Sequence, residues 1–133
     1  GKGVQLRDGD DVTIIATGLM VNEALQASDK LAEEGIKARV INIHTIKPLD
    51  RDIVVKAAKE TGVIVTAEEH SVIGGLGSAV AEVVTEECPI PVIKVGVNDV
   101  FGHSGPAVEL LKEFGLTADN IIANVKKAMA LKK

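Results

Sequence analysis

Short runs of β-branched and other apolar residues alternate along the chain with segments in which apolar positions recur every three or four residues. Four of these runs have the length and composition of strands, and they lie at 11–17, 37–43, 63–66 and 92–97. Before the first run, Val4 and Leu6 alternate with polar residues and precede Asp8-Gly9, which is a hairpin signal. The pattern therefore predicts a short antiparallel edge strand that leads through a hairpin into the first main strand.

The segments between the strands carry helical periodicity. The predicted helices span 20–34, 50–61, 78–87, 106–114 and a last stretch from 118 onward. Asp50 and Thr117 stand where N-terminal caps belong, and Gly35, Gly62 and Gly115 stand where helices end. Because apolar strands alternate with helices, the predicted fold class is α/β: a three-layer α/β/α sandwich around a mostly parallel five-stranded sheet with one antiparallel edge strand.

Composition narrows the class of protein. A length of 133 residues suits a single domain over 1–133, and 46% hydrophobic residues supply a core without disulfides. Only 2% of residues are aromatic and the net charge is −4, which argues against a nucleic-acid-binding surface. No apolar run reaches the ~20 residues of a membrane span, no secretory signal is expected, and the lone Cys88 favours a reducing compartment. We therefore expect a cytoplasmic domain that binds neither nucleic acid nor membrane.

Candidate chemistry lies at the carboxyl ends of the parallel strands, where open sheets bind ligands. Four loops are expected to meet there, at 18–19, 44–49, 67–77 and 98–105. The residues that we single out as candidates for an interface or an active-site entrance are His44, Glu68, Glu69, His70, Ile73, Gly74, Gly75, Gly77, Asp99, Phe101 and His103. Apolar residues stand among them and favour contact with a partner, namely Ile46, Val72, Ile73, Leu76, Val100 and Phe101.

The glycine-rich segment 74–77 admits two interpretations. Glycines ahead of a helix leave amides bare for an anion, but the Rossmann order and a Walker lysine are missing, and Glu68 and Glu69 would repel a phosphate. The alternative is that the glycines permit a tight turn and close packing of a helix on the sheet.

The neighbouring residues Glu68, Glu69 and His70 are the residue types of an acid–base set. Adjacent residues at a strand end point in opposite directions, so at most two of them can serve one site. No spacing supports a zinc site or a nucleophile triad. We therefore assign no catalytic, cofactor-binding or metal-binding residue.

Four motifs in this order resemble the C-terminal domain of transketolases. They are DVTIIATG at 11–18, RVINIHTIKPLD at 39–50, VTAEEHSVIGGLGS at 65–78 and GVNDVFGHSG at 96–105. The chain looks most like the separate C-terminal subunit of a split transketolase. Similar domains close 1-deoxyxylulose-5-phosphate synthases and the beta chains of 2-oxo acid dehydrogenases, which are the alternative families. An alternative of another class is a stand-alone anion- or nucleotide-binding module that uses 74–77.

The resemblance implies a role in a larger enzyme. In that family, thiamine diphosphate and Mg²⁺ lie between a diphosphate-binding and a pyrimidine-binding domain, and the latter carries the glutamate that activates the cofactor. Glu68 lies in a different motif and is not that glutamate. The implied function is two-carbon ketol transfer between sugar phosphates, in which this domain supplies assembly and part of the entrance. The implied partners are the other two domains, in a homodimer or heterotetramer. The chain begins at Gly1 rather than methionine, so we expect a piece of a longer chain that is inactive alone.

Overall fold

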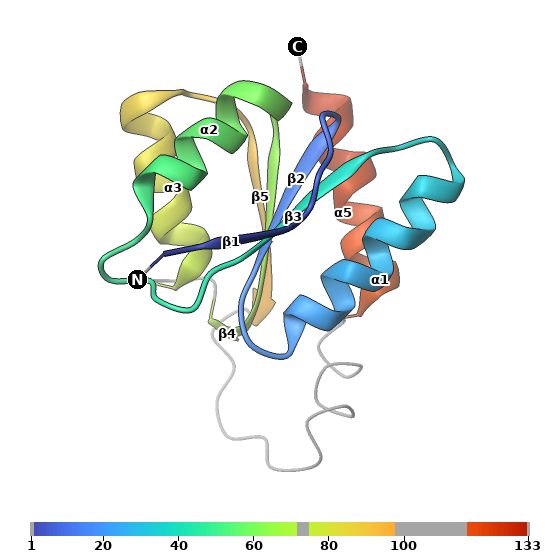
Figure 1. Cartoon of the computed structure of the whole chain (residues 1–133), viewed down its shortest axis with the longest axis horizontal. Helices are drawn as coiled ribbons and strands as arrows, with labels where there is room; N and C mark the ends of the chain where they lie inside the picture. The colour runs from blue at the N-terminus through green and yellow to red at the C-terminus, as the bar shows by residue number, and fades with distance from the viewer. Residues whose placement is uncertain (1, 72–74, 98–116, 133) are drawn as a thin grey trace.

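The computed structural model describes residues 2–71, 75–97 and 117–132 (Figure 1). Its strands are β1 (Val4–Arg7), β2 (Val12–Ala16), β3 (Ala38–Asn42), β4 (Ile64–Ser71) and β5 (Val92–Val97). Its helices are α1 (Met20–Glu33), α2 (Arg51–Thr61), α3 (Leu76–Glu87) and α5 (Ala118–Leu131). The predicted α/β class is confirmed. The helix predicted at 106–114 lies outside the described residues.

The strands form one mixed sheet in the order β1-β3-β2-β4-β5. β2, β3, β4 and β5 run parallel, whereas β1 runs antiparallel to β3. The predicted antiparallel edge strand is therefore confirmed, but the predicted hairpin is wrong, because β1 pairs with β3 and not with β2. β2 is buried along its whole length between β3 and β4 and has no open side. All four residues of β1 are exposed, which suits an edge.

Helices cover both faces of the sheet, as Figure 1 shows. α1 and α5 pack on one face against a core that includes Ile14, and α2 and α3 pack on the other against a core that includes Ile15. Successive strand residues point to opposite faces, so one strand supplies both cores. Each fully buried isoleucine contributes on the order of 1.5–3 kcal/mol through burial. The core is aliphatic, as the scarcity of aromatic residues predicts.

Two predicted helix caps are present. The Asp50 carboxylate accepts a hydrogen bond from the N–H of Ile53 at 3.4 Å, and the Thr117 hydroxyl accepts one from the N–H of Asn120 at 3.4 Å. α2 ends at Gly62, whose φ of 76° is left-handed, as predicted. None of the helices in the described ranges is both long and apolar enough to cross a membrane.

β4 is longer than its prediction. It runs over Ile64–Ser71 rather than 63–66, so the polar segment 68–71 belongs to a strand and not to a loop. β4 lies between β2 and β5, and its ladder with β5 continues, after an irregularity, to a last pair with Val97. Backbone pairing to neighbouring strands outweighs the low strand propensity of the polar residues. α3 correspondingly begins at Leu76, two residues before the predicted start.

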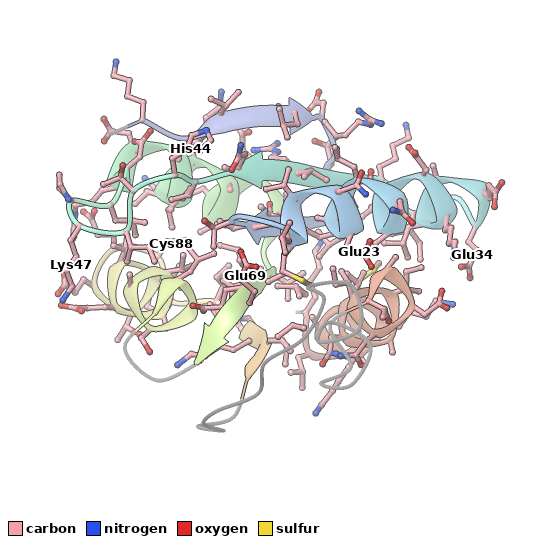
Figure 2. All side chains as sticks on the ribbon, turned by 90° about the horizontal axis from the view of Figure 1, so that it is seen from below. Glu23, Glu34, His44, Lys47, Glu69 and Cys88 are labelled. Carbon is pink, nitrogen blue, oxygen red and sulfur yellow. The ribbon has the colours of Figure 1, made fainter. Side chains whose placement is uncertain are left out.

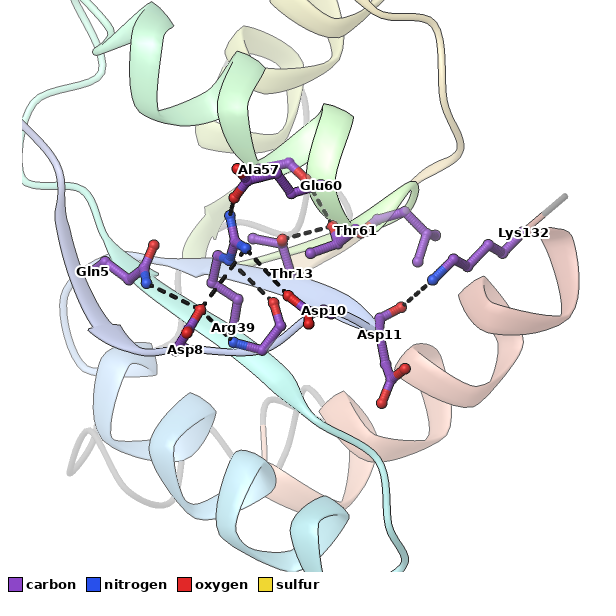
Figure 3. Close-up of polar contacts among 12 residues, drawn as sticks. Gln5, Asp8, Asp10, Asp11, Thr13, Arg39, Ala57, Glu60, Thr61 and Lys132 are labelled. Atoms are coloured by element: carbon purple, nitrogen blue, oxygen red, sulfur yellow. Dashed lines mark hydrogen bonds and ion pairs between the residues drawn. The ribbon is translucent and has the colours of Figure 1, made fainter.

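A buried arginine makes several contacts at the end of the sheet where the parallel strands begin (Figure 3). Arg39 on β3 is 3% exposed; its Nε donates to the carbonyl of Gly9 at 3.1 Å, and its Nη1 lies 2.8 Å from the carboxylate of Glu60 on α2. The carboxylates of Asp8 and Asp10 lie 3.8 Å from its Nη2. These contacts hold the turn between β1 and β2 against α2, away from the carboxyl ends of the parallel strands.

Candidate functional site

The carboxyl ends of the parallel strands lie at the lower end of the molecule in Figure 1, where α1 and α3 begin. We call this region the carboxyl edge; its described part comprises the turn 17–19, the loop 44–49, the end of β4 and residues 75–77. Figure 2 views the molecule from this side, with Glu69 in the middle and His44 toward β1. Five of the predicted candidates lie among the fully described residues at this edge, and each is taken in turn below.

Glu68 caps helix α3 from inside the domain. Its side chain is fully buried, and its two carboxylate oxygens accept the N–H groups of Leu76 at 2.9 Å and Gly77 at 2.8 Å. These are first-turn N–H groups that lack a partner within the helix, and the N-cap residue Gly75 has no side chain to satisfy them. A negative charge is favourable at this position because of the helix dipole. The site that a phosphate would occupy at this helix is therefore filled by the protein itself.

The glycine segment has the packing role that was the alternative to phosphate binding. A Cβ on Gly77 would lie 2.8 Å from Cγ of Lys94 and 2.9 Å from Oγ1 of Thr66, so a side chain there would push α3 off the sheet. Gly75 has φ −98° and ψ −151°, which is extended backbone. The close approach of helix and sheet is thus made at Gly77, and Gly75 needs no positive φ.

Glu69 reaches the opposite face of the sheet and contacts the start of α1. Its Oε1 accepts the N–H of Leu19 at 3.1 Å. Leu19 is the N-cap residue of α1 and makes no side-chain cap of its own. Gly18 has φ +60°, and a Cβ there would collide with the Glu69 carboxylate. Adjacent glutamates of one strand therefore hold the first turns of two helices on opposite faces of the sheet.

His44 lies apart from these carboxylates. Its ring is exposed, and its Nε2 lies 3.3 Å from Nδ2 of Asn42, at the end of β3. The Oδ1 atom of Asn42 is buried without a hydrogen-bond partner among the described residues. Within those residues, no hydrogen bond or ion pair joins His44 to Glu68 or Glu69. The structure thus brings together the two glutamates and the two helix starts, but not the histidine.

The remaining candidates fall on positions whose side chains are not described. His70 lies in β4, and its side chain is outside the described set, as are Ile73, Gly74, Asp99, Phe101 and His103. Two apolar residues that were expected to face a partner instead pack within the domain. Leu76 is fully buried between α3 and the sheet, and Ile46 is half-buried against the same core. Both lie beside α2 and α3, whose apolar faces need cover.

The chemistry of the carboxyl edge follows from these contacts. Glu68 has no exposed surface and both oxygens engaged, so it cannot exchange a proton with an outside substrate. At the start of α3 Glu68 already accepts the two N–H groups that a diphosphate would need, and at the start of α1 Glu69 accepts the N–H of Leu19. The described residues contain no group of three or more His, Cys, Asp or Glu side chains that would hold a metal ion. In the described part of the edge, the two carboxylates thus position backbone at the start of α1 and α3.

The sequence matches a protein-family model described as the C-terminal domain of transketolase, over residues 1–121. The chain belongs to the transketolase C-terminal domain family. Its fold agrees with that family as well as its sequence. A solved structure described as a split gene transketolase, in an inactive beta4 tetramer, superposes with a TM-score of 0.94 at 57% sequence identity, over 99% of this chain and 43% of that chain.

Curated relatives of this transketolase domain cover nearly the whole chain. The 6-deoxy-6-sulfo-D-fructose transketolase subunit of Clostridium sp. (strain MSTE9) is 55% identical over 122 residues, or 92% of this chain and 38% of the relative. A 1-deoxy-D-xylulose-5-phosphate synthase of Heliobacterium modesticaldum is 44% identical over 131 residues, or 98% of this chain and 20% of the relative. The chain thus spans less than half the length of the relatives that it matches.

Proposed function

We propose that this domain is the C-terminal section of a cytoplasmic, thiamine-diphosphate-dependent transketolase, and that it serves assembly rather than cofactor chemistry. Family membership and a sequence identity of 55–57% to a transketolase subunit and a split-gene transketolase support the parent activity. That activity moves a two-carbon ketol unit between sugars. When bound in the complete enzyme, thiamine diphosphate with Mg²⁺ supplies the carbanion chemistry. The residues of this domain hold the carboxyl edge in shape against the other domains.

The observation that carries the proposal is that the two glutamates of the carboxyl edge are engaged within the domain, whereas Leu19 at the same edge is exposed. The carboxylates of Glu68 and Glu69 are engaged with the domain's own backbone. Leu19, at the junction of the 17–19 turn and α1, is 48% exposed. An exposed large apolar side chain beside these engaged carboxylates is the kind of contact that we expect a partner to cover. We assign the pyrimidine-binding domain as that partner, on the same chain or in a neighbouring subunit of a homodimer or heterotetramer.

The test compares the assembly of the wild-type domain with that of a Leu19→Asp variant. The domain is joined to or mixed with the diphosphate- and pyrimidine-binding segments of the same enzyme, and ketol transfer is measured against concentration. We expect the domain alone to be inactive and to bind no thiamine diphosphate, and Leu19→Asp to weaken assembly. Leu131→Asp is the matched control, since Leu131 is 50% exposed and ends α5 at the opposite end of the molecule (Figure 1). Equal weakening by both variants, or by neither, would contradict an interface at Leu19.

The same assay identifies the substrate class. We propose a ketose phosphate as the donor, and the name of the Clostridium relative makes a sulfonated ketose the competing donor. Formation of 1-deoxy-D-xylulose 5-phosphate tests the second candidate function, which is favoured by the 44% identity to a synthase of that compound over 98% of this chain. A complete enzyme that forms this compound and transfers no ketol unit would replace transketolase by the synthase.

A further inference from the structure

The start of α1 is held from outside the helix. Leu19, the N-cap residue, already has helical backbone angles of φ −63° and ψ −22°, and its apolar side chain offers no acceptor. The turn before it is tied down by backbone bonds, from Thr17 N–H to the carbonyl of Ala67 at 3.2 Å and from Val21 N–H to the carbonyl of Gly18 at 3.2 Å. The remaining constraint on the Leu19 N–H is the Glu69 carboxylate at 3.1 Å.

Glu69 and Gly18 form a matched pair. The carboxylate lies so close to Gly18 that a Cβ there would collide with it, and the φ of +60° at Gly18 is one that other residues adopt at a penalty. The turn is closed by a backbone hydrogen bond from the N–H of Met20 to the carbonyl of Thr17 at 3.2 Å, and because glycine is the most flexible residue, a side-chain contact from outside the turn restricts it further. The side chain of Glu69 supplies that contact from β4, a strand that is fixed in the middle of the sheet.

The two glutamates differ in what they do for the fold. Glu68 is fully buried and accepts two hydrogen bonds, so its loss would be felt by the whole domain. Glu69 is only half-buried, and its bond to Leu19 lies at an exposed site where water can replace it. Loss of Glu69 therefore changes the shape of the 18–19 turn more than it changes the stability of the domain.

We propose that Glu69 is a positioning residue of the assembled enzyme: it locks the Gly18–Leu19 turn and so presents the exposed Leu19 side chain to the pyrimidine-binding domain. The inference rests on the proposed function, which supplies this partner. Leu19 stands at the carboxyl edge as an exposed large apolar residue, and the relatives carry more than half of their length outside the part that this chain matches. A preorganised turn binds its partner without first losing conformational freedom.

The experiment compares four variants in the complete assembly. Glu69→Ala removes the acceptor, Glu69→Gln keeps an acceptor oxygen at the same reach, and Glu33→Ala removes an exposed charge from the far end of α1 as a control. Leu19→Asp tests the interface itself. The dissociation constant for assembly is measured from the concentration dependence of activity, and thermal melts by circular dichroism report the stability of each variant.

We expect Glu69→Ala to weaken assembly about tenfold, Glu69→Gln to restore the affinity to within about threefold, and Glu33→Ala to have no effect. The melting temperatures of all four should stay within a few degrees of the wild type. If Glu69→Ala does not fold, Glu69→Asp replaces it, since the shorter side chain withdraws the carboxylate from the N–H of Leu19 and leaves Gly18 unchanged.

Two outcomes overturn the inference, and one separates it from the proposed function. If Glu69→Ala assembles as well as Glu33→Ala, the contact between Glu69 and the 18–19 turn is not needed for assembly. Glu69→Gln that is as defective as Glu69→Ala shows that charge, and not the hydrogen bond to Leu19, is the cause. If Leu19→Asp assembles normally, Leu19 is not in the interface and the proposed function is contradicted. If Leu19→Asp is defective but Glu69→Ala is not, only the positioning role of Glu69 is contradicted.

Discussion

Replacement of Glu68 is the sharpest test of how the carboxyl edge is built. The carboxylate is fully buried and accepts two N–H groups at 2.9 and 2.8 Å. Glu68→Ala leaves both donors buried and unpaired, at a penalty of about 1–3 kcal/mol each. It also removes a charge that the dipole of α3 favours. We expect the free energy of unfolding to fall by about 3–5 kcal/mol, a large part of the ~5–15 kcal/mol typical of a domain.

Glu68→Gln gives a smaller and better-defined change. The amide oxygen can still accept one N–H, but the amide nitrogen faces the other donor, so one bond is lost and one is weakened. We expect a loss of about 2–3 kcal/mol. With a urea m-value of about 1.5 kcal/mol/M, this moves the unfolding midpoint down by about 1.3–2 M.

Urea unfolding followed by circular dichroism measures both variants, because the chain has no tryptophan or tyrosine for fluorescence. Glu82→Gln is the control: Glu82 lies on the same helix but is exposed, so its replacement should change stability by less than about 0.5 kcal/mol. If Glu68→Gln unfolds at the same midpoint as Glu82→Gln, the carboxylate does not stabilise α3 as argued here.

Three further variants test other contacts of the fold by the same urea measurement. Gly77→Ala should lower stability by about 1–3 kcal/mol, because its methyl would meet Oγ1 of the buried Thr66 at 2.9 Å; an unchanged midpoint contradicts the close approach. Thr66→Val should raise stability by up to about 1 kcal/mol, because Oγ1 of Thr66 has no hydrogen-bond partner among the described residues, and a loss would reveal one. Arg39→Met should lower stability by only about 1–2 kcal/mol, because Asp8 and Asp10 stay hydrated once the cation is gone.

The order of strands and helices could be predicted from the sequence, because apolar periodicity reports local structure. Asp50 and Thr117 cap the predicted helices, and the switch from strand to helix follows the predicted alternation. The two corrections both concern pairing between distant strands. β1 pairs with β3 rather than with its neighbour in sequence, and β4 extends beyond its apolar part because β5 pairs with it. Neither strand pairing can be recognised in the local pattern of apolar and polar residues.

The candidate site shows the same limit. The sequence indicated that Glu68 and Glu69 point to opposite sides of the sheet, and they do, since each contacts a helix on a different face. Their bonding partners could not be predicted. Leu76 is eight residues from Glu68, across a glycine segment, and Leu19 is 50 residues from Glu69. The sequence already placed acidic residues before the glycines, but it did not show that Glu68 accepts the N–H groups of Leu76 and Gly77.

The acidic pair near the end of β4 gives a physical reason for the proposal that this sheet edge serves as an interface and not as a ligand crevice. Parallel α/β sheets gather helix N-termini at one edge, and those N-termini attract anions. Here β4 carries two adjacent carboxylates, one for each face: Glu68 accepts two N–H groups at the start of α3, and Glu69 accepts one at the start of α1. A carboxylate of the domain itself thus lies at the positive end of both α1 and α3. In the proposed assembly, the described part of this edge presents Leu19 and its neighbouring turn to another protein surface, and the Glu69 carboxylate that contacts the start of α1 also holds the shape of that turn.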